Sequence, residues 1–230
     1  MDPLNYKALY LLQDEVLQTV FEEPLGYYLT GGTALSRFYL NHRYSDDLDF
    51  FCHDLVVFPD AFRLVYRKLK TKWSNATIEV DARDFKRVFI QQEKTLLKLD
   101  FIADRVIRIG LPVIRDGIYI DTVKNILSNK LSAILGRDEE RDIADLICIT
   151  MAYQFSWKTI LDNLAVKESF EREDLLFRIK TFPIENLKTV PFILKKTIAE
   201  YSDALLTISR DIRMQDENSL AGNSALSLEI

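Results

Sequence analysis

The segment from Tyr27 to Phe51, YYLTGGTALSRFYLNHRYSDDLDFF, constrains the fold more than any other part of the chain. Its pattern predicts a strand, a Gly-Gly-Thr turn, a short helix, a loop and a second strand. Gly31 and Gly32 lack a Cβ, so the backbone there can approach a phosphate closely at the start of the helix. Thr33 can cap this helix and offer a hydroxyl group. The turn therefore indicates a phosphate-binding site.

The second strand carries a pair of carboxylates. Because side chains alternate along a strand, Asp47 and Asp49 share one face while Leu48 and Phe50 share the other, which can enter a core. Two adjacent carboxylates repel each other unless a cation lies between them, and Mg²⁺ prefers such oxygen ligands together with substrate phosphates. Taken singly, each motif is more often ordinary surface sequence. Together they indicate a nucleoside triphosphate and Mg²⁺, with Mn²⁺ as the alternative ion.

A third carboxylate is expected from the strand-like segment TLLKLDFIAD, residues 95–104. If this segment pairs beside the first carboxylate strand with its apolar face in the core, Asp100 lies next to Asp47 and Asp49. The result is a carboxylate triad. The alternative is an edge-strand aspartate that faces water, with Asp104 nearby.

From residue 121 onward the periodicity is helical. Asp121 or Thr122 can cap a first helix that ends near Gly136, and Lys130 falls within its apolar stripe. A lysine at such a position is costly to bury unless it has a partner or reaches an open site. We expect Lys130 to face the triad and hold a triphosphate; a lysine that snorkels at the helix edge is the alternative.

The next helix, predicted for residues 138–154, places Asp142 and Asp145 one turn apart. Either carboxylate can pair with Lys130 and orient it, and we favour Asp145. Further helices are predicted near residues 157–167, 171–181 and 191–208. The last 20 residues are polar and weakly patterned, which predicts a frayed tail or a partner-binding segment.

The order of these motifs resembles a known superfamily. Gly-Gly-Thr followed by Asp-Leu-Asp, with fourteen residues between Gly32 and Asp47, resembles the signature of the polymerase-β-like nucleotidyltransferases. More narrowly, GGTALSRFYLNHRYSDDLDFF resembles the AbiEii/AbiGii group of toxin nucleotidyltransferases. Members of that group also carry an Arg-x-Ser before the pair, matched here by Arg43 and Ser45, and a Lys followed by Asp-x-x-Asp on consecutive helices. The resemblance covers roughly residues 26–150.

This resemblance implies an α+β fold in two domains. The first, residues 1–121, is a polymerase-β-like nucleotidyltransferase domain with a small mixed β-sheet, and the second, residues 122–230, is mostly helical. The implied reaction moves a nucleoside monophosphate from an NTP to an acceptor hydroxyl. The implied setting is a toxin–antitoxin or phage-defence system, with the 3′ end of tRNA as acceptor and a cognate antitoxin as partner.

The site roles follow from the motifs and the resemblance together. The expected metal ligands are Asp47, Asp49 and Asp100. Phosphate contacts are expected from the turn, from Lys130 and from two arginines: Gly31, Gly32, Thr33, Arg37 and Arg43. Asp142 or Asp145 orients Lys130. His42 and His53 flank the carboxylate strand, and a ligand or acid/base role for either is the less favoured alternative. Ser45 lies two residues before Asp47, so phosphorylation there would weaken NTP binding.

Composition limits the possible partners. The 230 residues are 48% hydrophobic, which is enough for a sizeable core, and no apolar run could span a bilayer. We therefore expect a cytoplasmic protein without membrane contacts. The net charge of −5 argues against broad nucleic-acid binding, although ten Lys or Arg stand against five Asp or Glu between Asp60 and Lys98. This basic strip either binds an RNA backbone or forms a solvated helix face.

Two other functions remain open at this point. One is nucleotidylation of a small molecule or a protein, which the acidic total charge favours. The other is a nucleotide-binding module without turnover. Three carboxylates together with Lys130 argue against that module, since binding alone does not require a base.

Overall fold

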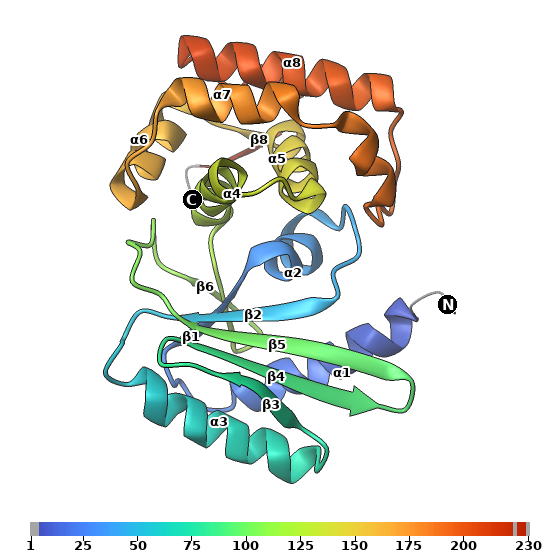
Figure 1. Cartoon of the computed structure of the whole chain (residues 1–230), viewed down its shortest axis with the longest axis vertical. Helices are drawn as coiled ribbons and strands as arrows, with labels where there is room; N and C mark the ends of the chain where they lie inside the picture. Colours follow the sequence, from blue (N-terminus) through green and yellow to red (C-terminus); the bar gives the residue numbers. More distant parts are fainter. Residues whose placement is uncertain (1–4, 223–224, 229–230) are drawn as a thin grey trace. The chain divides into compact units, whose positions relative to one another are not determined.

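The computed structural model describes residues 5–222 and 225–228, and Figure 1 shows the order of their elements. The chain divides into two compact units. The sheet unit comprises the chain up to Ala34, Ser45–Val106 and Pro112–Asp121; the helical unit comprises Leu35–Tyr44, Ile107–Leu111 and the chain from Thr122 onward. The last change of unit along the chain lies between Asp121 and Thr122. Two short segments that precede it in the chain also belong to the helical unit.

The sheet unit is built on a seven-stranded mixed sheet in the order β3-β4-β5-β2-β1-β7-β6. β2 pairs in parallel with β5 and β1 with β7, and the other neighbours are antiparallel. The α+β fold class with a mixed sheet is therefore confirmed, and β6 and β7 extend the sheet beyond the predicted strands. The strands are β1 Tyr27–Thr30, β2 Asp47–Cys52, β3 Thr77–Asp81, β4 Phe85–Gln92, β5 Thr95–Ala103, β6 Val113–Arg115 and β7 Ile118–Ile120.

Two helices, α1 (Tyr6–Val20) and α3 (Phe58–Lys72), run along one side of this sheet (Figure 1). The apolar residues of β2 and β5 point toward them, and the rings of Phe50 and Phe101 stack at 4.9 Å. Phe62 of α3 packs edge-on against Phe101 at 5.4 Å. Each fully buried ring of this kind contributes about 1.5–3 kcal/mol. The alternating acidic residues of the same strands consequently point to the opposite face.

The first motif continues from β1 into a helix without a loop. α2 spans Gly31–Leu35 and passes directly into η1, a π-helix over Ser36–Leu40 that carries Arg37. Asn41 ends it in the left-handed conformation, and its amide donates to the carbonyl of Ser36 at 2.7 Å. Short π-helical turns of this kind frequently occur at functional sites.

The helical unit contains the segments that the periodicity predicted, with one displaced. Thr122, left open with Asp121 as the cap, is the N-cap of the first helix and accepts from the amide of Asn125 at 3.2 Å. The helix expected at 191–208 begins later, where Thr197 and Glu200 form a capping box. The elements are α4 Val123–Gly136, α5 Glu140–Ala152, α6 Trp157–Lys167, α7 Arg172–Thr181, the 3₁₀-helix η2 Ile184–Thr189 and α8 Ile198–Met214.

The sequence predicts a frayed tail or a partner-binding segment for the last 20 residues, and several of the described ones are instead packed within the helical unit. Asn218 is buried, and its side-chain amide donates to the carbonyls of Thr150 and Tyr153 at 2.6 and 2.7 Å. Strand β9 (Leu226–Ser227) pairs in parallel with β8 (Tyr153–Gln154). Residues 223–224 and 229–230 of the predicted tail lie outside the described residues. No helix in the described part of the chain is long and apolar enough to cross a membrane.

Candidate active site

Gly31 lies directly against Asp49. Strand β1 ends at Thr30, which pairs with Asp49 in the antiparallel register of β1 and β2. Gly31 then adopts a φ of +71°, and a Cβ placed on it would lie 2.5 Å from Oδ2 of Asp49. Any other residue would collide with this carboxylate in a backbone conformation that side chains disfavour. The glycine is therefore required both by the turn and by the carboxylate beside it.

Asp47, Asp49 and Asp100 share one face of the sheet. In the parallel register of β2 and β5, Asp49 is the partner of Asp100 and Asp47 is the partner of Lys98. Side chains at paired positions point to the same side of a sheet, as do residues two apart on one strand. The strand pairing that would gather the three predicted carboxylates is thus the pairing observed, and Asp100 is only 6% exposed.

Two basic side chains contact these carboxylates. Lys98 Nζ lies 3.0 Å from Asp47 Oδ2 and 3.6 Å from Asp100 Oδ2. Arg87 donates to both oxygens of Asp100, at 2.7 and 2.9 Å. Burial lowers the pKa of the Lys98 ammonium, but the charges of Asp47 and Asp100 outweigh this and leave its pKa above the usual value. The hydrogen bonds to Asp100 likewise raise the pKa of the Arg87 guanidinium.

The chemistry of these donors suits a divalent ion. The three carboxylates supply the hard oxygen ligands that such ions prefer. Within the described residues, no three Asp, Glu, His or Cys side chains form a ready-made metal site. Asp47 and Asp100 hold the Lys98 ammonium as a stand-in cation instead.

The hydroxyl of Thr33 is used inside the fold. It is fully buried, lies 2.8 Å from Ser45 Oγ and donates to the carbonyl of Asp47 at 2.5 Å. It therefore ties the start of α2 to the start of β2, and only its backbone remains available to a phosphate. Ser45 is 1% exposed, so its phosphorylation, suggested by the sequence, requires this region to open first.

A second cluster lies in the helical unit around the carboxylate of Asp145. Arg43 donates to it through Nε at 2.7 Å and a terminal nitrogen at 2.9 Å, and Nε2 of His42 lies 2.8 Å from it. His42 contacts Oδ1 of Asp145, and Lys130 Nζ lies 2.7 Å from Oδ2. Burial raises the pKa of Asp145, but the charges of Lys130 and then Arg43, together with the hydrogen bond to His42, outweigh it and hold the pKa well below its usual range.

Both acids of the Asp-x-x-Asp motif contact Lys130. Asp142 Oδ1 lies 2.8 Å from Lys130 Nζ, and Asp142 Oδ2 accepts from Arg137 Nε at 2.8 Å. Burial lowers the pKa of Lys130, but the negative charges of Asp145 and Asp142 together raise it by more. The pKa of Lys130 therefore lies above its usual value. Lys130 is therefore neither exposed at the helix edge nor alone in an apolar stripe. Its ammonium is a charged group fixed between two carboxylates.

Four residues of these clusters have contacts that were not predicted from the sequence. Arg87 and Lys98 were counted only as part of a basic strip, Arg43 was expected to contact phosphate, and His42 was not paired with Asp145. The alternation that placed Asp100 also placed Lys98 on its face, so that signal was present in the sequence. The Arg87 contact depends on the register of β4 against β5, and the His42 contact joins residues 103 positions apart.

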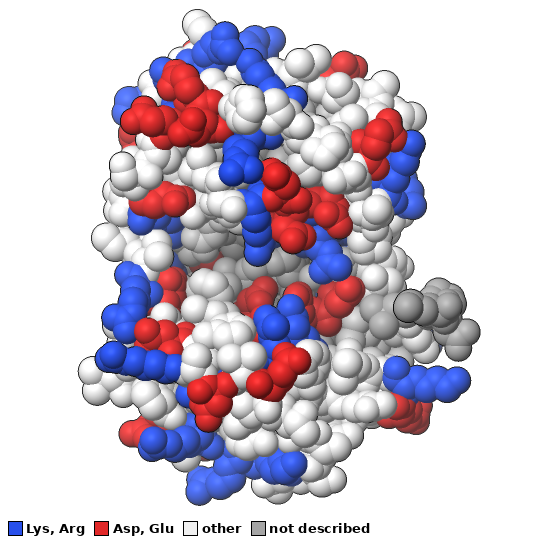
Figure 2. Space-filling model, viewed as in Figure 1, with Lys and Arg blue, Asp and Glu red and all other residues white. Residues whose placement is uncertain are grey.

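The predicted basic strip is largely neutralised within the protein. Arg63 pairs with Asp60 at 2.6 Å, Lys86 pairs with Asp81, and Lys70 donates to the carbonyl of Ala76. Figure 2 agrees with this: basic and acidic side chains are interleaved over the face shown. Several charges of the strip are therefore already paired with acidic groups of the same protein.

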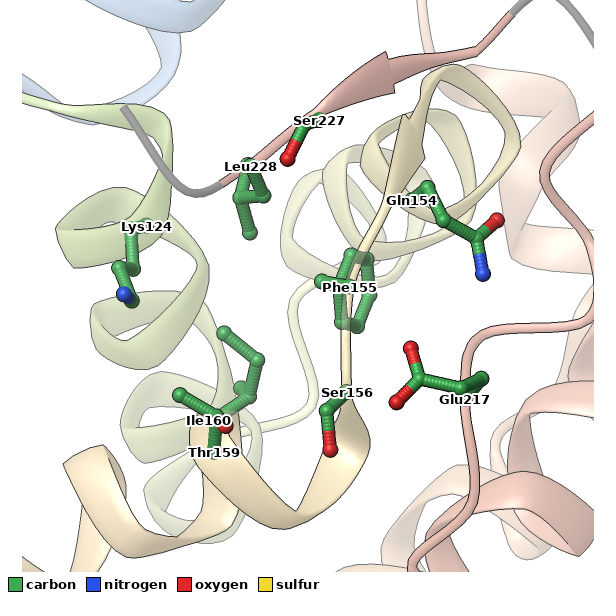
Figure 3. A pocket seen from close by; sticks show the side chains of 9 residues that line it. All are labelled: Lys124, Gln154, Phe155, Ser156, Thr159, Ile160, Glu217, Ser227 and Leu228. Carbon is green, nitrogen blue, oxygen red and sulfur yellow. The ribbon is translucent and has the colours of Figure 1, made fainter.

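The helical unit also contains a separate cavity of about 290 Å³ (Figure 3). Its wall includes Lys124 from α4, Phe155 and Ser156 just before α6, and Leu228 near the C-terminus. None of the predicted site residues lines it. The two side-chain clusters described above are therefore the better candidates for the chemistry.

Comparison with known proteins agrees with this geometry. Residues 11–213 match the family described as nucleotidyl transferase AbiEii toxin, type IV TA system. JHP933 from Helicobacter pylori is similar in structure, with a TM-score of 0.61 and 20% identity over 93% of this chain and 95% of that one. No curated protein matches the sequence.

A second solved structure shares the fold. MenT4, a nucleotidyltransferase toxin from Mycobacterium tuberculosis H37Rv, superposes with a TM-score of 0.60 and 12% identity over 90% of this chain and 82% of that one. Membership of the matched family implies an NTP substrate, usually a divalent metal ion, and a cognate antitoxin. The family match spans most of the chain, so the protein belongs to the AbiEii toxin family and is a nucleotidyltransferase.

Proposed function

We propose that this enzyme uses Mg²⁺ to transfer a nucleoside monophosphate from an NTP to a hydroxyl at the 3′ end of a tRNA. It would act in the cytoplasm as a toxin that its antitoxin counteracts. The observation that carries the proposal is the register that places Asp49 beside Asp100, with Gly31 against Asp49. A glycine turn and paired acids on one sheet face combine phosphate and metal binding in one unit.

The residues of the sheet unit would bind the metal ion and the triphosphate. Asp47, Asp49 and Asp100 would hold the divalent ion, which supplies charge neutralisation at the phosphates and lowers the pKa of the attacking hydroxyl. The backbone of Gly31 and Gly32 would bind the triphosphate at the start of α2. Asp100 would also favour loss of the proton from the acceptor hydroxyl.

The helical-unit cluster would stabilise the leaving pyrophosphate. Three cations, Arg43, Lys130 and Arg137, are held there by Asp142 and Asp145. Cations fixed in position beforehand suit the developing charge of a polyphosphate leaving group. Arg37, in η1 directly after α2, is a further candidate for a phosphate contact.

Transfer of a labelled nucleotide tests this proposal. The protein is incubated with each α-³²P-labelled NTP, Mg²⁺ and total tRNA, or with a metabolite and protein pool in place of the tRNA. We expect label on tRNA with the wild type and none with Asp49→Asn, while the surface variant Asp162→Asn transfers as the wild type does. Label only on metabolites or protein would exclude the tRNA acceptor. Full transfer by Asp49→Asn would exclude the assigned carboxylates.

A further inference from the structure

The ammonium of Lys98 occupies the position between two of the proposed metal ligands. Lys98 and Asp100 are two residues apart on β5 and so share a face, and Lys98 is the register partner of Asp47 on β2. The distances of 3.0 Å to Asp47 and 3.6 Å to Asp100 place its charge within reach of both carboxylates. Lys98 is thus the cation that offsets their mutual repulsion in the structure.

A divalent ion and the Lys98 ammonium are mutually exclusive at this position. Both are cations that require the same carboxylate oxygens, and they would repel each other strongly at such a separation. The side chain of Lys98 is one-third exposed and has a flexible four-carbon stem, so it can swing toward solvent.

Arg87 is held more firmly than Lys98. Its planar guanidinium binds Asp100 at two points, lies 3.8 Å from Glu79 and stacks over the ring of Phe85 at 5.2 Å. Of the two cations on these carboxylates, Lys98 is therefore the one that can leave at small structural cost.

We propose that Lys98 is the internal counter-ion of the metal site, holding Asp47 and Asp100 together until a divalent ion displaces it. This inference rests on the proposed function only in taking these carboxylates as the metal ligands. Lys98 acts here as a positioning residue. Free divalent ions would accordingly bind weakly, because each must first displace a bound ammonium. An ion that arrives on a triphosphate brings extra negative charge, which can accept the released Lys98.

Binding of Mn²⁺ without nucleotide tests this inference. Isothermal titration calorimetry or Mn²⁺ electron paramagnetic resonance would measure the affinity of the wild type, Lys98→Met and Lys98→Arg. Methionine keeps most of the stem but removes the charge, so we expect Lys98→Met to bind Mn²⁺ at least about tenfold more tightly. Lys98→Arg keeps the charge and should stay near the wild type. Lys94→Met, at the turn of the same hairpin, makes the same charge change away from the carboxylates and should leave the affinity unchanged.

Three outcomes would overturn the inference. The first is a folded Lys98→Met protein, checked by circular dichroism, that binds Mn²⁺ no more tightly than the wild type. The second is a gain of the same size in Lys94→Met. The third is a gain that survives the addition of Asp47→Asn, because the ion would then bind elsewhere. Lys98→Gln provides the same comparison if Lys98→Met does not fold.

The metal titration is independent of nucleotide transfer. A tighter Mn²⁺ site in Lys98→Met together with no transfer by the wild type would support the counter-ion and reject the proposed reaction. Transfer by the wild type, with no change of Mn²⁺ affinity in Lys98→Met, would support the proposed reaction and reject the counter-ion role of Lys98.

Discussion

Gly31 and Asp49 fit together so closely that a Cβ on residue 31 would lie 2.5 Å from Oδ2 of Asp49. The turn that would bind phosphate and the carboxylate that would bind the metal ion therefore determine each other's position. A side chain added at residue 31 must displace this carboxylate or shift the turn.

Gly31→Ala tests this coupling. The added methyl group should push the Asp49 carboxylate aside, and a misplacement of about 1 Å costs on the order of 100-fold in rate. We expect nucleotide transfer to fall by about that factor or more. Gly117→Ala is the matched control, because Gly117 shares a positive φ of +80° but has nothing within 4 Å of the added Cβ. Equal losses of activity in both variants would show that backbone strain alone is responsible.

Arg43→Met should destabilise the helical unit. It removes the bidentate partner of Asp145, whose side chain is completely buried. Lys130 still compensates the charge of Asp145 in this variant, so the expected cost is that of the lost charge-assisted hydrogen bonds, about 1.5–3 kcal/mol of unfolding free energy. Urea denaturation measures this loss. Arg63→Met, whose pair with Asp60 is 76% exposed on both sides, should leave the denaturation midpoint unchanged. A similarly small effect of Arg43→Met would contradict the assigned burial.

The same cluster should make stability depend on pH in acid. The pKa of Asp145 is depressed in the folded protein, so its contribution is fully present above the unfolded value of about 3.9. It is lost as the pH falls below that value toward the folded pKa. Urea midpoints measured from pH 6 to pH 3 should therefore decline more gently in Asp145→Asn than in the wild type, from a lower starting value. Parallel curves would contradict the depressed pKa.

Thr33→Val should loosen the link between the start of α2 and the start of β2. The buried carbonyl of Asp47 and hydroxyl of Ser45 would lose their shared partner, at a cost of about 1–3 kcal/mol. Thr71→Val removes a similar hydroxyl-to-carbonyl hydrogen bond on the exposed side of α3 and should cost much less. Urea denaturation compares the two. If Thr33→Val is as mild as Thr71→Val, the link contributes little.

Much of the fold could be predicted because its signals are local. Alternation along residues 95–104 was enough to place Asp100 on the same face as the first two carboxylates, since the apolar residues of that strand admit only one orientation. The strands Val113–Arg115 and Ile118–Ile120 escaped prediction because three residues are too few to show a period. α8 was started too early at Pro191, although Thr197-Ile-Ala-Glu200 is a capping-box sequence.

The ion pairs of the site depend on three-dimensional packing. No spacing in the sequence says that Arg43 rather than Arg37 meets Asp145, because the choice depends on how the π-helix ends at Asn41. Nor does alternation reveal that Lys98 turns toward Asp47, since a lysine on a half-exposed strand can adopt many rotamers. The sequence pattern predicts which face of a strand or helix a residue occupies. Which side chain it contacts there depends on three-dimensional packing.

The ten residues Leu35–Tyr44 lie between two sheet-unit segments in the chain but belong to the helical unit, where Arg43 pairs with Asp145. The segments of the two units therefore alternate along the sequence, although each unit is compact in space. A recombination event that exchanged only the chain after residue 121 for that of a distant relative would separate this arginine from the carboxylate with which it pairs. Viable chimeras of such toxins should therefore inherit Leu35–Tyr44 together with the C-terminal half.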